Sequence, residues 1–147
     1  MTDDVNPTPT RVAIPVLDDA FARVAELARL ESNWDAQGSE VPSPDVIALA
    51  RRVLLEAGKR FEPEIHTDVQ PYAVAPMSGG GVYLDWRSEH AELEVIIGPG
   101  ELGYLFVDKS DPERRFEEAD DVDMAIILDR LSRVLNSRLR ELRGRDR

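Results

Sequence analysis

The sequence predicts an α+β fold, an antiparallel meander of three to four strands with helices packed on one face, in the order α-α-β-β-β(-β)-α. Two observations lead to this prediction. Apolar residues recur with a helical period of 3.6 toward both ends of the chain and with a strand period of 2 in its middle. The glycine-containing connections between the alternating segments are also too short for the crossovers that parallel strands need.

The first predicted helix covers about residues 19–30, with Asp18 as its N-cap. Before it, residues 1–16 contain three prolines, which remove backbone donors and disfavour helix at the preceding residue. We therefore expect a flexible N-terminal arm over 1–16, a single domain over 17–142 and a basic tail over 143–147.

The second predicted helix has the clearest boundaries. Ser43 is placed to cap its start, Pro44 suits the first helical position, and Gly58 suits the position just after its end. Its apolar stripe consists of Val46, Ile47, Ala50, Val53, Leu54 and Ala57.

After Pro63 the apolar period changes to 2. A weak strand is expected over 65–75, and the strands over 82–86, 93–97 and 102–107 are better defined. Within them, Leu84, Trp86, Leu93 and Val95 are expected to be buried, and Asp85, Glu92 and Glu94 to face outward. The third helix is expected from about residue 121 to 139 or beyond, because its apolar residues recur at helical spacing.

Composition narrows the function. The chain has 147 residues, no Cys and a formal charge of −11, so disulfides and thiolate chemistry are excluded and attraction to nucleic acid or an anionic membrane is disfavoured. Its longest apolar runs are far below the ~20 residues of a membrane span. The acidic start, Met1-Thr2-Asp3-Asp4, is unlike a signal peptide, and a cytoplasmic location is expected.

The segment from Asn33 to Ser39, which contains Trp34-Asp35-Ala36-Gln37-Gly38, precedes a proline-containing helix start. With the later Gly-Gly turn that leads into 82–86 and the strand at 93–97, it resembles an uncharacterised group of small bacterial and phage-encoded proteins. The resemblance covers about residues 27–107. It implies the α+β fold and a bacterial or phage origin, and it implies no activity.

Two groups of residues have the composition of metal ligands. Glu64, His66 and Asp68 share one face of a predicted extended segment. Asp85, His90, Glu92 and Glu94 resemble the carboxylate sets that hold Mg²⁺ in nucleases. The polar face of an amphipathic sheet explains both groups without an ion, and we favour that interpretation.

Other candidate sites are weaker. A strand follows Gly79-Gly80-Gly81 where a phosphate loop would be followed by a helix, and no Ser has the setting of a nucleophile. Residues 130–147 contain seven Arg and two acids. The excess of Arg suits either the negative end of a helix dipole or a phosphate ligand. We accordingly predict no catalytic residue, no cofactor and no metal.

The function expected is that of a small, acidic, non-catalytic protein-binding module, such as an antitoxin- or immunity-type neutraliser, a phage inhibitor or an accessory subunit, whose partner has a basic surface. The alternatives are a nuclease-like metal enzyme and a nucleic-acid-associated protein that uses the Arg-rich C-terminus. Trp34 is either a plug at the core edge or an interface anchor. The predicted contact residues are Trp34, Asp35, Glu92, Glu94, Asp111, Glu113, Glu117, Glu118, Asp120, Arg138, Arg140 and Arg143.

Overall fold

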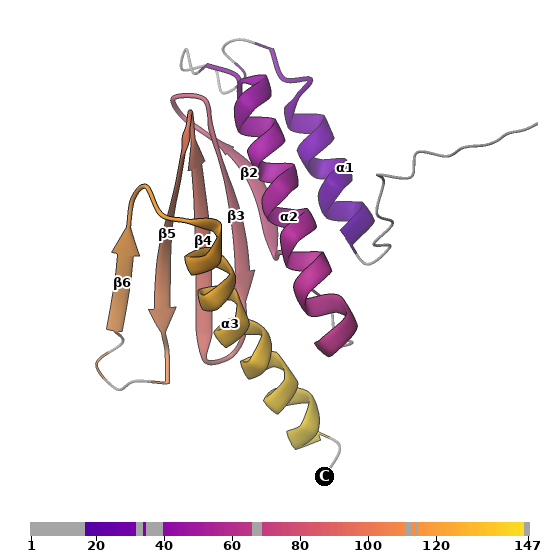
Figure 1. Cartoon of the computed structure of the whole chain (residues 1–147), viewed down its shortest axis with the longest axis vertical. Helices are drawn as coiled ribbons and strands as arrows, with labels where there is room; N and C mark the ends of the chain where they lie inside the picture. The colour runs from indigo at the N-terminus through magenta and orange to yellow at the C-terminus, as the bar shows by residue number, and fades with distance from the viewer. Residues whose placement is uncertain are drawn as a thin grey trace, which may run out of the picture.

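A computed structural model describes residues 17–31, 34, 40–65, 69–110, 113 and 115–145, with only the backbone of 62–65, 115 and 138–145. Three helices and five strands make up this part of the chain (Figure 1). In chain order they are α1 (Asp18–Leu27), α2 (Pro44–Ile65), β2 (Ala73–Met77), β3 (Gly81–Arg87), β4 (Ala91–Gly98), β5 (Glu101–Asp108), β6 (Arg115–Ala119) and α3 (Met124–Arg145). No helix of the described residues has the length and apolar character needed to cross a membrane.

The strands form one antiparallel sheet in the order β2-β3-β4-β5-β6. This confirms the α+β fold and the meander, but the sheet has five strands where three to four were expected. The additional strand is β6, which lies in a segment so rich in acids that no strand period was visible. Its pairing with β5, from Tyr104 opposite Ala119 to Asp108 opposite Arg115, defines it.

Burial alternates along the central strands. In β4 every second residue from Ala91 to Ile97 is buried and those between are half-buried. Leu84, Trp86, Leu93 and Val95 are fully buried, as expected. We call the surface of the sheet that carries these four residues the core face, and the opposite surface the second face.

The helices do not all cover the core face as expected. α2 and α3 contact each other, β3 and β4, whereas α1 contacts α2 and the edge strand β2 (Figure 1). Two helices about 10 Å wide cover the width of about four strands spaced at about 4.8 Å. We attribute the position of α1 beside β2 to this limit, because α2 and α3 already occupy the space over the central strands.

The boundaries of α2 test the predicted signals. The Val46 N–H donates to Ser43 Oγ at 3.3 Å, so the N-cap is confirmed. The end predicted at Gly58 is wrong: the helix continues to Ile65, because buried Phe61 extends its apolar stripe by one turn beyond Ala57. This extension also removes Ile65 from the predicted weak strand, and the strand found there, β2, begins only at Ala73.

The other two helices also differ from their predicted starts. α1 begins at Asp18 itself, its N-cap position is Leu17, and no side chain caps it. α3 begins at Met124, and its backbone is helical through residues 143–145, part of the predicted basic tail.

Candidate protein-binding face

Register brings the acids of the second face into rows that cross the sheet. In an antiparallel sheet, residues directly opposite each other carry their side chains on the same face. One row, which we call the acidic row, runs Asp85, Glu94, Leu105, Glu118 across four strands. The neighbouring row, which we call the mixed row, runs Arg87, Glu92, Val107, Phe116. Both rows combine apolar and charged side chains from segments far apart in the sequence.

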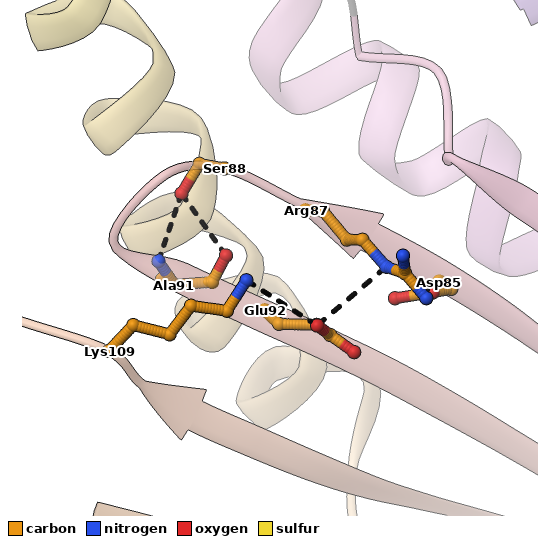
Figure 2. Close-up of polar contacts among 6 residues, drawn as sticks. All are labelled: Asp85, Arg87, Ser88, Ala91, Glu92 and Lys109. Carbon is orange, nitrogen blue, oxygen red and sulfur yellow. Dashed lines mark hydrogen bonds and ion pairs between the residues drawn. The ribbon is translucent and has the colours of Figure 1, made fainter. Parts of the chain in front are cut away.

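Asp85 does not face solvent as expected. It lies on the second face, but only 3% of it is exposed, since β3 is an inner strand and the Arg87 guanidinium lies against its carboxylate (Figure 2). Arg87 Nε donates to Asp85 Oδ2 at 2.8 Å, while Oδ1 is buried without a hydrogen-bond partner among the described residues. Burial raises the pKa of Asp85, Glu92 and Glu94 raise it further, and Arg87 opposes the shift.

Glu92 lies between two cations. Its Oε1 is 3.7 Å from Arg87 Nε and 3.6 Å from Lys109 Nζ, and its side chain is 26% exposed (Figure 2). The Arg87 guanidinium also lies 4.1 Å from the centroid of the Tyr72 ring. The mixed row is therefore largely neutralised at its β3–β4 end.

The acids of the acidic row are less compensated. No ion pair in the described part of the chain involves Glu94 or Glu118. Glu94 is half-buried and Glu118 is exposed, as are Glu113 and Asp120 near β6. Between these carboxylates, Leu105 is half-buried. This row therefore offers negative charge on both sides of an apolar side chain.

Glu117 belongs to a different environment. It faces the core side of β6, where Tyr104 Oη donates to its Oε1 at 3.0 Å and Arg130 of α3 also donates to it. These hydrogen bonds, chiefly the one from Arg130, lower the pKa of Glu117. Although its side chain is 44% exposed, we assign Glu117 to the contact between β6 and α3.

The predicted metal-ligating residues are only partly brought together. Asp85 and Glu94 are opposite each other, but His90 is exposed in the β3–β4 turn, and Glu92 is engaged by Arg87 and Lys109. Among the residues that the structure describes, no group of three or more ligands is arranged to hold a metal ion. Glu64 lies in the last turn of α2, not in an extended segment, and His66 and Asp68 lie outside the described residues.

The remaining predicted contact residues are scattered. Trp34 is half-buried, and its Nε1 donates to the Glu40 carbonyl at 3.1 Å, a contact within the connection between α1 and α2. Asp35 and Asp111 lie outside the described residues. Arg138, Arg140 and Arg143 lie on the helical backbone of α3, and their proposed binding role stays a prediction.

Sequence reasoning missed the apolar members of the second face. Phe116 is 67% exposed on β6, and Ile96, Leu105 and Val107 are half-buried. The only signal for Phe116 was a lone aromatic residue inside a charged segment. Ile96, Leu105 and Val107 alternate with core residues, so the strand period predicts them as strand residues but does not indicate an apolar second face.

Comparison of the chain with protein-family models, with curated proteins and with solved structures gave no match. The resemblance to small bacterial and phage proteins therefore stays a prediction.

Proposed function

We propose that this chain is a non-catalytic protein-binding module that receives a basic partner on the second face of its sheet. The observation that supports this most directly is the acidic row, where Glu94 and Glu118 stand on either side of Leu105 in register. An apolar contact surrounded by charge is the usual anatomy of a protein interface.

The charge of the whole chain supports a basic partner. Residues 1–129 carry a net charge of −16, and the acids on the second face add little to stability because exposed carboxylates repel one another. A positively charged partner turns this repulsion into attraction and accelerates association. Neutralisers, inhibitors and accessory subunits all act by binding a partner in this way, and the proposal covers all three classes.

The proposal is tested with the partner captured from the native host by the immobilised full-length chain. Association rates are then measured at several salt concentrations. We expect the rate to fall steeply between about 0.05 M and about 1 M salt, because the Debye length shrinks to about 3 Å. Replacing Glu94 and Glu118 together by Gln should slow association by about threefold to tenfold at low salt.

A matched control removes the same charge elsewhere. Glu26 and Glu31 are exposed on α1 and just after it, so Glu26→Gln with Glu31→Gln should change the rate much less. An acidic partner, an association rate indifferent to salt, or equal effects of the two double variants would contradict docking on the second face.

A further inference from the structure

β6 ends the sheet, and the direction of its backbone groups can be read from the ladder. The Lys109 N–H donates to the His90 carbonyl at 2.8 Å, so the backbone groups of residues 109, 107, 105 and 103 point to β4. Those of the alternate residues of β5, such as Phe106 and Asp108, then point to β6.

The same alternation continues into β6. Phe106 is paired with Glu117 and Asp108 with Arg115, so Glu117 and Arg115 bond toward β5. The N–H and C=O groups of Phe116 and Glu118 therefore point to the open edge. No described strand pairs with that edge. An open edge with aligned donors and acceptors is a template for another strand.

The charges of β6 invert about Phe116. Arg115 precedes the aromatic residue and Glu117 follows it, and the sequence continues the inversion as Arg-Arg-Phe-Glu-Glu from residue 114 to 118. When two such strands pair antiparallel with Phe116 opposite Phe116, Arg115 of each copy stands opposite Glu117 of the other. Opposite charges directly across from each other stabilise a strand pair.

We propose that the chain forms a homodimer in which the β6 strands of two copies pair antiparallel about Phe116 and join the two sheets into one. The outward N–H of each Phe116 donates to the carbonyl of the other, the arrangement of a hydrogen-bonded antiparallel pair. Both Phe116 rings lie on the same face of the joined sheet and cover each other. The contact is isologous, with its two-fold axis between the two Phe116 residues.

Other symmetric registers are opposed by charge. A pairing centred on Arg115 places two guanidinium groups opposite each other, and pairings centred on Glu117 or Glu118 do the same with carboxylates. Like charges directly opposite each other destabilise a strand pair. Of the registers centred on residues 115 to 118, only the one centred on Phe116 avoids like charges directly opposite each other.

The dimer is expected to be weak, since two five-residue strands bury less than the roughly 1,200 Å² of a standard stable interface. It leaves Glu94 and Leu105 of the acidic row free of the contact, whereas Glu118 lies on the paired strand itself, and it brings two second faces side by side. The dimer does not depend on the basic partner: a monomeric chain would overturn it without affecting docking on the second face.

Sedimentation of the full-length chain from about 2 µM to about 500 µM tests the dimer. We expect a monomer–dimer equilibrium that Phe116→Asp weakens by at least about tenfold, because it buries two carboxylates at the axis. Tyr72→Asp is the control: Tyr72 is 63% exposed against 67% for Phe116, and it precedes β2 at the opposite edge of the sheet.

A charge swap separates the proposed register from loss of folding. Arg115→Glu and Glu117→Arg should each reduce self-association, whereas a one-to-one mixture of the two variants should form a heterodimer. In the heterodimer, positions 115 and 117 of one variant carry carboxylates and lie opposite guanidinium groups at positions 117 and 115 of the other. Circular dichroism checks that both variants are folded. A monomeric wild type at all concentrations, a dimer indifferent to Phe116→Asp, or a mixture that stays monomeric would overturn the proposal.

Discussion

Asp85 shows how one residue departs from the pattern around it. Its position in an alternating strand predicts an outward carboxylate, yet the side chain is buried, with one oxygen bonded to Arg87 and the other unpartnered among the described residues. Burying a charge is costly unless it is fully hydrogen-bonded. Asp85 therefore destabilises the native state when it is ionised.

The cost of burying the ionised Asp85 carboxylate depends on pH. The native pKa of Asp85 is raised above its ordinary value of 3.8, so the protonated form is favoured in the folded protein. The associated stability is fully present below the unfolded pKa and is lost as the pH rises through the folded pKa.

Asp85→Asn should therefore raise the melting temperature at pH 7, because it removes the charge and retains an acceptor for Arg87. The difference from wild type should shrink as the pH falls below about 4, where the wild-type carboxyl is protonated. Thermal melts of both proteins from about pH 3 to about pH 8 measure it. Glu26→Gln serves as an exposed control, and a variant less stable than wild type at pH 7 would show that the Arg87 ion pair outweighs burial.

At the scale of the elements, the alternating burial along β4 places the neighbouring residues Glu92 and Leu93 on opposite faces of the sheet. Leu93 is fully buried in the core, so Leu93→Ala should cost about 2–5 kcal/mol. The ion pairs of Glu92 with Arg87 and Lys109 are partly exposed to solvent, which weakens them. Glu92→Ala should therefore cost no more than about 1 kcal/mol. Chemical denaturation of both variants checks the difference, and equal costs would mean that the register is wrong by one residue.

The connection from β6 to α3 depends on a glycine in β5. A Cβ on Gly103 would lie 3.0 Å from the Ala119 carbonyl oxygen and 3.2 Å from Asp120 Oδ1. The neighbouring backbone must shift to admit it, so Gly103→Ala should cost about 1–3 kcal/mol. At Gly98 the nearest atom to an added Cβ is 3.9 Å away, so Gly98→Ala should be nearly neutral in the same denaturation assay. Equal stability of the two variants would contradict the close approach.

At the scale of the whole molecule, 29 acids against 18 bases make the chain repel itself. Raising the salt from about 0.01 M to about 0.2 M should increase the melting temperature by a few degrees at pH 7, because screening weakens the repulsion between exposed carboxylates. Near the isoelectric pH the same addition should have little effect. A melting temperature that falls with salt at pH 7 would indicate that favourable ion pairs, such as those of Glu92, outweigh the repulsion.

The sequence by itself determined the class of the fold, the three helices, the three central strands, and the buried side of β3 and β4. These features follow from local periods, since 3.6 and 2 are imposed by backbone geometry within one element. Ser43 could be recognised as a cap for the same reason: its hydrogen bond reaches only three residues along the chain.

Only the tertiary structure decided the features that depend on residues far apart in the sequence. β6 is a strand because β5 supplies its hydrogen-bond partners. α2 continues beyond Gly58 because Phe61 is buried in the core. Asp85 is buried because it lies on an inner strand and Arg87 covers its carboxylate. The acidic row and the open edge at Phe116 likewise exist only through strand order and register, which no local period records. Tertiary contacts contribute more free energy than the preference of any single residue, and for this reason they override it at these positions.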